Sequence, residues 1–369
     1  MKPKFGRKAE LVTFLPFWEA IFIIVGTVIG AGILGLPSVF AKNGYLTATA
    51  ALLVSLVLVI ELAFMIVELE GSSSRQIPSL IGYYLGGMAR AVAFLGFLIA
   101  VFSALTAYYI GLADSFRSLG LPPGLGYLTG IIMSFYVCYR GLKGAARAEL
   151  IITIVMIGLI FLIILFSSTN VNVEKLNEFH LPNLASPFGI IIFALYGHMI
   201  LPEVKRLLIS AGLRKKISLA IILGYSIPAM IYLLFSASIV GSLESIPDVA
   251  TLAFHGYLYV LGISFALLAL STSLMGNALV VRDTLWEDFR IKEEGILIAP
   301  FIPLMLATLG GKNFVTMLDI GGIFGICLIS IMIALSYLRG GRKIYRKISA
   351  TACILIFLYL ILRKIYLMI

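Results

Sequence analysis

The sequence predicts an all-α polytopic membrane protein, and three observations lead to this fold class. Hydrophobic residues make up 61% of the 369 positions and charged residues only 12%, and the mean hydropathy is +1.07. Apolar runs long enough to cross about 30 Å of hydrocarbon recur along the whole chain. Two of these runs contain glycine and proline where a helix would otherwise continue. This composition excludes an ordinary soluble domain.

The apolar runs predict eleven transmembrane helices. They cover residues 18–40, 45–67, 91–113, 125–139, 150–167, 187–208, 217–240, 253–280, 296–309, 314–337 and 348–367. The fourth and ninth runs are short. Residues 1–10 form a basic, polar tail, and the apolar run that follows is too long for a signal peptide and lacks a small-residue cleavage site, so Trp18 is expected to begin the first membrane helix.

The distribution of positive charge predicts the orientation in the membrane. Most of the 28 Lys and Arg residues fall in alternate loops between the apolar runs. Since cytoplasmic loops carry the excess of Lys and Arg, the N-terminus is expected in the cytoplasm and the C-terminus outside a multi-pass cell-membrane protein. This topology and anionic lipid headgroups explain the net charge of +10, so nucleic acid is not an expected partner.

The two interrupted runs are the strongest indication of function. Residues 26–37 read GTVIGAGILGLP, and residues 193–204 read FALYGHMILPEV. Irregular backbone at membrane depth persists only where it lines a cavity or is buried in protein. Two broken helices in corresponding positions of two halves indicate the binding site of a secondary transporter. The competing interpretation is that small residues only allow close helix packing.

The chemistry of such breaks favours an amino acid as substrate. Freed amides at the start of a half-helix suit a carboxylate, and freed carbonyls suit an ammonium. The amides belong to Gly30, Ala31, Gly32 and Ile33. The carbonyls belong to Val28, Phe193 and Ala194. A zwitterion would match both kinds of group.

Other polar residues within the runs have two readings each. Tyr108, next to Tyr109, could close over a bound carboxylate or bond to a neighbouring helix. His198 in the second break could carry a proton or remain neutral and bond to loose backbone. Glu61 is expected to be protonated or tied to the broken helices, as a support rather than a ligand. Glu68 lies nearer a cytoplasmic end, where loop ion pairs explain it.

Three segments carry a resemblance to a known family. GTVIGAGILGLPSVFAKNGY, FALYGHMILPEVKR and STSLMGNALVVRDTLWED resemble the amino acid/auxin permease branch of the amino acid–polyamine–organocation superfamily. The resemblance implies a five-plus-five inverted repeat with an eleventh helix appended. The chain would then be a single transporter domain with a cytoplasmic tail (1–17), a first repeat (18–168), a second repeat (186–338) and the appended helix (345–369).

The resemblance also implies a sodium site. In sodium-driven members, carbonyls of the first helix and oxygens of the eighth hold the cation, and the matching residues here are Gly26, Ile29, Ala269, Thr272 and Ser273. Neutral oxygens suit a hard cation, although Thr and Ser hydroxyls often bond only to a carbonyl of their own helix. Some proton-coupled relatives place a lysine from the fifth helix there. The run 150–167 has no basic residue, which favours sodium.

These observations together predict an ion-coupled amino acid symporter that works by alternating access. Its expected partners are the amino acid, the ion and membrane lipids. Sodium is the expected coupling ion, a proton-coupled symporter is the alternative, and an ion channel is a further one. No nucleotide-binding loop, metal-ligand cluster or nucleophile triad occurs in the sequence. The sequence therefore predicts neither an enzyme nor a cofactor besides the coupling ion.

Overall fold

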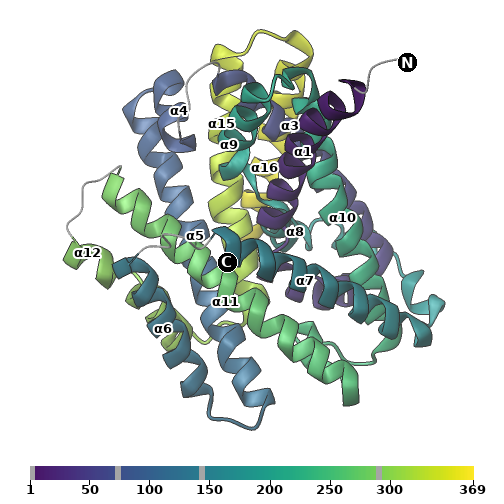
Figure 1. Cartoon of the computed structure of the whole chain (residues 1–369). Helices are drawn as coiled ribbons and strands as arrows, with labels where there is room; N and C mark the ends of the chain where they lie inside the picture. The colour runs from purple at the N-terminus through teal and green to yellow at the C-terminus, as the bar shows by residue number, and fades with distance from the viewer. Residues whose placement is uncertain (1–4, 71–75, 141–145, 288–292) are drawn as a thin grey trace.

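The structure is a computed structural model that describes residues 5–70, 76–140, 146–287 and 293–369. In these segments every regular element is helical, which confirms the all-α prediction (Figure 1). Among them, seven helices are long and apolar enough to cross a membrane, or eight if the bent pair Leu15–Val28 and Ala31–Asn43 is one span. Ile151–Ser167 and Ile296–Leu309 are shorter apolar helices.

The first part of the chain follows the predicted runs with two differences. Its helices are α1 (Phe5–Val28), α2 (Leu36–Asn43), α3 (Tyr45–Glu70), α4 (Ile77–Leu85), α5 (Gly87–Ser118), α6 (Pro123–Arg140) and α7 (Ala146–Ser167). Helix α1 begins well before Trp18, so most of the expected tail is helical. Helix α4 was not predicted. It has Pro78 in its first turn and ends at Gly86, whose φ of 96° favours glycine.

The second part of the chain also follows the predicted runs, with more interruptions. Its helices are α8 (Phe188–Leu195), α9 (Leu201–Ser210), α10 (Ile217–Ser242), α11 (Gly256–Glu287), α12 (Glu293–Ile298), α13 (Phe301–Leu309), α14 (Phe314–Ile320), α15 (Cys327–Gly340) and α16 (Ile344–Tyr366). Short 3₁₀ turns, among them η5 (His198–Ile200), connect some of them. The run 296–309, expected as one helix, is divided between α12 and α13 around Pro300.

Both predicted helix breaks are present, and they are built alike. Between α1 and α2 the chain forms a 3₁₀ turn, η1 (Ala31–Gly35), and the helix bends by 48°. Helices α2 and α9 each begin with Leu-Pro, at Pro37 and Pro202. Proline lacks the N–H that an α-helix would donate four residues back. The carbonyls of Ile33 and His198 instead accept from the residue three positions on, which tightens each turn into 3₁₀ geometry.

The run 314–337 was expected to be one regular helix, but the structure interrupts it with a π-helical turn, η8 (Gly321–Ile326). The turn packs against α5 and α8. A β-carbon on Gly321 would lie 3.1 Å from Cβ of Ser103, and one on Gly322 would collide with the carbonyl of Gly189. Glycines therefore allow this wider turn to lie directly against the neighbouring backbones.

Charged side chains dock the last helix, α16, at both of its ends. Lys364 pairs with Asp319 of α14 at 2.5 Å. At the other end, Nε of Arg346 lies 3.6 Å from Oε2 of Glu61, and the same guanidinium donates to Glu68. Glu61, expected to be protonated or to support the broken helices, is therefore an ion-pair partner of α16 instead. An isolated carboxylate at this depth would be costly, and the nearby guanidinium compensates it.

Glu68 also makes the loop ion pair that the sequence indicates. Its carboxylate accepts from Lys343, which precedes α16, at 2.6 Å, and from the Tyr337 hydroxyl at 2.5 Å. The hydrogen bond to Glu68 raises the pKa of Lys343, because it stabilises the charged ammonium. α15 and α16 are therefore held to α3 near the loop between them.

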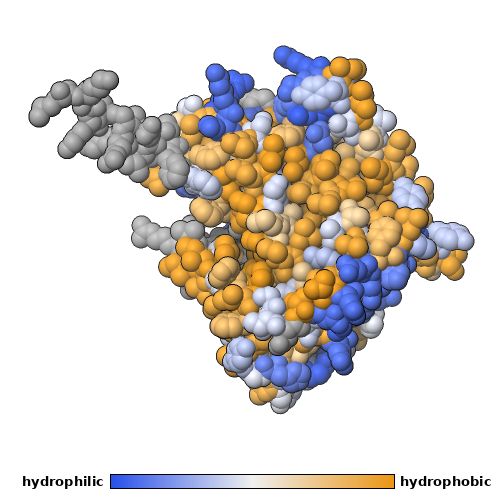
Figure 2. Space-filling model, turned by 90° about the vertical axis from the view of Figure 1, so that its right-hand side faces the viewer, coloured by the Kyte–Doolittle hydropathy of each residue, from blue (hydrophilic) through white to orange (hydrophobic). Residues whose placement is uncertain are grey.

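The surface has the hydropathy pattern of a membrane protein. In Figure 2 hydrophobic side chains cover the middle of the visible face, and hydrophilic groups gather at the top and toward the lower right. Large apolar side chains such as Phe161, Leu234 and Leu355 are more than half exposed. Apolar surface of this extent on long apolar helices is what lipid contact requires.

Candidate functional site

The two helix breaks lie directly against each other. A β-carbon added to Gly32 in the first break would lie 3.1 Å from the Cα of Ala194, at the end of α8. A β-carbon added to Gly197 in the second break would lie 2.7 Å from Cγ2 of Val28. A β-carbon at position 197 would clash with Val28, and one at position 32 would be closer to Ala194 than most real β-carbons come to a neighbour, so glycine at these two positions eases the contact. The structure therefore brings together the residues predicted from two distant parts of the chain.

One tyrosine joins the two breaks. The hydroxyl of Tyr232, on α10, lies 2.7 Å from the carbonyl oxygen of Val28 and 2.9 Å from that of Ala194. Its side chain is fully buried. These are two of the three carbonyls predicted to face an ammonium. Sequence reasoning missed Tyr232, although carbonyls freed by two helix breaks imply that some buried donor must satisfy them.

Two of the backbone amides predicted to bind a carboxylate are hydrogen-bonded within the protein, one of them to α11. The Ala31 N–H donates to Oγ of Ser273 at 2.9 Å, and a β-carbon on Gly30 would also lie 2.9 Å from that oxygen. The Ile33 N–H donates to the carbonyl of Gly30 at 3.3 Å. Two of the four predicted amides are therefore hydrogen-bonded within the protein, one of them to a residue of the predicted ion site.

The aromatic candidates have different surroundings. Tyr108 of α5 is buried beside the side chains of Ser273 and Asn277. The hydroxyl of the neighbouring Tyr109 donates to Oγ of Ser134 on α6 at 2.9 Å, so this tyrosine bonds to a neighbouring helix. Phe193 places its ring 3.7 Å from the β-carbon position of Gly32. Tyr108 and Phe193 thus lie near the first break, and Tyr109 bonds away from it.

The five residues of the predicted sodium site lie on α1, on the adjoining bend and on α11. Thr272 donates to the carbonyls of Leu268 at 2.8 Å and Ala269 at 3.2 Å, which is the intrahelical alternative weighed above. Ser273 accepts from the first break, as described. Ile29 donates to Val25 at 2.8 Å and so ends the regular part of α1.

Helix α7 contributes a further hydroxyl beside this set. The β-carbon position of Gly26 lies 3.4 Å from Cγ2 and 3.9 Å from Oγ1 of Thr153. The sequence indicated only that this stretch lacks a basic residue. Thr153 is neutral and its methyl group lies closer to the Gly26 position than its hydroxyl, but the hydroxyl is an oxygen of the kind that binds a hard cation.

His198 is fully buried in the second break. Its Nε2 lies 2.9 Å from the carbonyl oxygen of Val59, so this nitrogen contacts the backbone of the regular helix α3 instead of the loose backbone of a break. Its ring also contacts those of Tyr196 and Tyr225. Glu61, the other predicted supporting residue, lies within ion-pair distance of Arg346 on α16.

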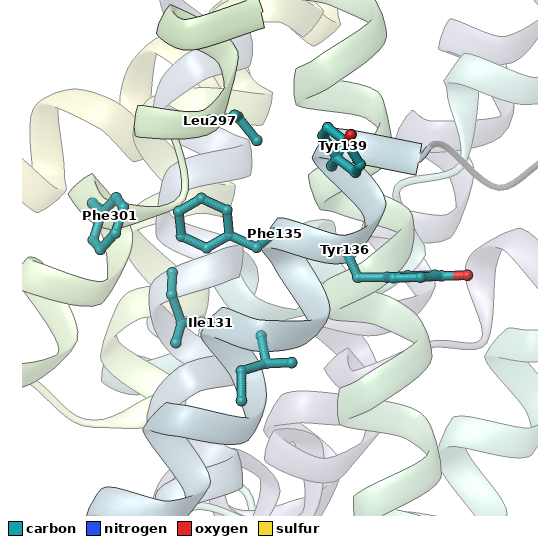
Figure 3. Close-up of a pocket in the computed structure, with 7 residues that line it drawn as sticks. Ile131, Phe135, Tyr136, Tyr139, Leu297 and Phe301 are labelled. Carbon is teal, nitrogen blue, oxygen red and sulfur yellow. The ribbon is translucent and has the colours of Figure 1, made fainter.

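A large surface hollow lies away from the breaks. It has a volume of about 540 Å³ and lies between α6, α12 and α13 (Figure 3). Within it the rings of Phe135 and Phe301 pack edge to face, with their centroids 5.1 Å apart. The side chains of Tyr136 and Tyr139 on its rim are 59% and 68% exposed. Its apolar lining offers no group that would orient a zwitterion, so it is not the candidate substrate site.

Apolar helices of membrane-spanning length around two facing helix breaks define a membrane transport protein. The chain belongs to the tryptophan/tyrosine permease family, whose sequence profile matches residues 15–367. It is also similar to glutamine transporter 2 of Aliivibrio fischeri, with 23% identity over 357 residues that cover 90% of each chain. The protein is therefore a multi-pass membrane amino acid permease and not an enzyme.

Proposed function

We propose that this permease is a secondary active symporter that carries an amino acid by alternating access and is driven by sodium. The observation that carries the proposal is the meeting of the two helix breaks, with Gly32 against Ala194 and Tyr232 on the carbonyls of both. Backbone groups of opposite polarity are concentrated at one place in an otherwise apolar bundle. A zwitterion is the ligand that such a pair of helix ends favours.

The substrate's ammonium would bind at the carbonyls of Val28 and Ala194. Tyr232 donates to them in this structure, so the ammonium would compete with the phenol or share the carbonyls with it. The carboxylate would bind at the amides that follow Gly30, where Ser273 accepts from Ala31. Tyr108, beside Ser273, is positioned to contribute a phenol to the same end of the ligand.

The sodium ion would bind among Gly26, Ile29, Ala269, Thr272 and Ser273. Thr153 supports this assignment, because its neutral hydroxyl lies near Gly26. In some proton-coupled relatives a charged lysine of the fifth helix is expected at this site instead. Ser273 belongs to the proposed ion set and also contacts the first break. An ion that reorients Ser273 would thereby change the amides offered to the substrate, and binding linkage makes the effect reciprocal.

Proton coupling is the second candidate, and one observation favours it. His198 is a buried imidazole within the second break, and its Nδ1 has no hydrogen-bond partner among the described residues. Such a nitrogen can take up a proton. Uptake that follows a proton gradient in the absence of sodium would move the coupling site from Thr272 and Ser273 to His198.

For the whole chain we propose eleven spans, an N-terminus inside and a C-terminus outside. Helix α6, helix α7 and the pair α12–α13 would cross the membrane in addition to the longer apolar helices. The matching Leu-Pro starts of α2 and α9 support a five-plus-five inverted repeat, with 18–168 and 186–338 as its halves. This is the architecture implied by the resemblance to the amino acid–polyamine–organocation superfamily.

Uptake into proteoliposomes tests the proposal. Purified protein is reconstituted, and labelled amino acids are offered under a sodium gradient at equal pH, under a proton gradient without sodium, and with neither. We expect accumulation only with sodium, and counterflow of labelled substrate into preloaded vesicles. A conductance without counterflow would contradict the transporter mechanism, and accumulation driven by protons alone would contradict the sodium site.

A further inference from the structure

Three buried polar atoms near the second break have no hydrogen-bond partner among the described residues. They are the hydroxyl of Tyr196, Nδ1 of His198 and the hydroxyl of Tyr225. The ring centroids of Tyr196 and His198 are 5.1 Å apart, and those of His198 and Tyr225 are 5.7 Å apart. The two phenols are also close enough to interact electrostatically. We call these three residues the polar triad.

The hydrogen-bonding role of each atom in the polar triad follows from its neighbours. A carbonyl can only accept, so Nε2 of His198 carries the hydrogen in its 2.9 Å contact with Val59. In the neutral ring Nδ1 is then an acceptor. The phenols of Tyr196 and Tyr225 each hold an O–H to donate. Each such group left unpaired in a buried site costs about 1–3 kcal/mol, so an acceptor and two donors together imply a shared polar partner.

The polar triad adjoins the proposed zwitterion site. The β-carbon position of Gly197 lies 3.7 Å from the hydroxyl of Tyr225 and 2.7 Å from Cγ2 of Val28. Tyr225 and Tyr232 are seven residues apart on α10 and so lie on the same face, roughly 10 Å apart along the helix axis. Tyr232 contacts the carbonyls proposed for the ammonium. The polar triad therefore adjoins, through Gly197, the residue Val28 whose carbonyl is proposed for the ammonium.

We propose that the polar triad is the side-chain subsite of the transported amino acid and takes a neutral group that both donates and accepts hydrogen bonds, such as a hydroxyl or a carboxamide. The inference rests on the proposed function. The bound group would donate to His198 and accept from the two phenols. A purely apolar side chain would leave all three unpaired. A carboxylate would have no proton to give to Nδ1. A water molecule can fill the same role when no substrate is bound.

Competition between matched substrates tests this subsite. Uptake by the reconstituted protein is measured with tyrosine against phenylalanine and with glutamine against methionine, since the members of each pair differ chiefly in side-chain hydrogen bonding. We expect the wild type to prefer the polar member of at least one pair by roughly tenfold or more, because a site built around a hydrogen bond rejects the analogue that lacks it. Tyr225→Phe and Tyr196→Phe should each reduce this ratio.

The control variant is Tyr136→Phe, which makes the same chemical change on the exposed rim of the apolar hollow and should keep the wild-type ratio. Continued uptake of the apolar member by Tyr225→Phe shows that this variant is folded, and Tyr196→Phe provides the independent second measurement. An active wild type without polar preference, or a ratio that neither variant changes, overturns the inference and leaves only a resident water. A wild type that takes up no amino acid overturns the proposed function itself.

Discussion

The amide of Ala31 and the hydroxyl of Ser273 are joined by a 2.9 Å hydrogen bond across 242 residues of sequence. The bond connects the first helix break to α11, and it is made by a side chain that we assign to the ion site. A change at Ser273 therefore acts on both proposed ligands. If the assignment is right, substrate affinity and ion affinity must fall together when this residue is altered.

Replacing Thr272 and Ser273 together by alanine should abolish the sodium dependence of uptake. The change removes two proposed ligand oxygens, and the fold should persist because alanine favours helix and the lost bonds contribute about 0.5–1.5 kcal/mol each. Uptake at a series of sodium concentrations measures the effect. Thr308→Ala is the control, since among the described residues that hydroxyl bonds to Leu304 and Met305 of its own helix alone. Unchanged sodium dependence in the double variant would eliminate this site.

Tyr232→Phe should destabilise the ligand-free protein and enlarge the thermal shift that substrate produces. Without the phenol O–H, the carbonyls of Val28 and Ala194 lose their buried donor, a loss of about 1–3 kcal/mol. An ammonium would then bind without displacing a competitor. Melting temperatures with and without amino acid measure both effects. A smaller shift than in the wild type would show that Tyr232 assists binding instead of competing with it.

Gly32→Ala should weaken substrate binding by roughly tenfold or more, because its β-carbon would press on the Ala194 backbone and separate the two breaks. Binding is measured by the substrate-induced thermal shift. The matched control is Gly158→Ala on α7, where an added β-carbon meets no atom within 4 Å. Equal affinity in the two variants would mean that the contact between the breaks has no part in binding.

Arg346→Gln should lower the melting temperature by several degrees, because the carboxylates of Glu61 and Glu68 lose the guanidinium between them. Adding Glu61→Gln to this variant should restore part of the loss, since it removes one uncompensated charge. Arg342→Gln, at an exposed position before α16, is the control. If both arginine variants melt alike, the ion pairs do not fix α16 to α3.

Cysteine labelling from either side tests the proposed orientation. Ser245→Cys should react with an impermeant reagent added outside intact cells, and Lys215→Cys only after the membrane is opened. Both positions are exposed. The native residues Cys138, Cys327 and Cys353 are buried, so background labelling should be low. Reaction of both reporters from the same side would rule out the eleven-span topology.

Local sequence patterns predicted the helical class and both breaks, because glycine and proline determine backbone geometry where they stand. Contacts between distant segments were not predictable in the same way. Tyr232 occurs in an ordinary apolar run, and only the fold places it on two carbonyls. Arg346 lies just before the last apolar run, and nothing in that local pattern indicates that α16 brings it to Glu61. The partner of a buried charge depends on how the helices pack, and local patterns in a single sequence do not predict that packing.

The contacts of Tyr232 limit how completely the two breaks can be satisfied. A phenol has a single proton, whereas two carbonyl oxygens lie within 2.9 Å of this one. At any instant only one of them receives a full hydrogen bond, and the proton alternates between two acceptors. An ammonium brings three protons, enough for both carbonyls and one more oxygen. Among the described residues these two carbonyls share the one proton of Tyr232, and an amino group is a ligand that can donate to both of them.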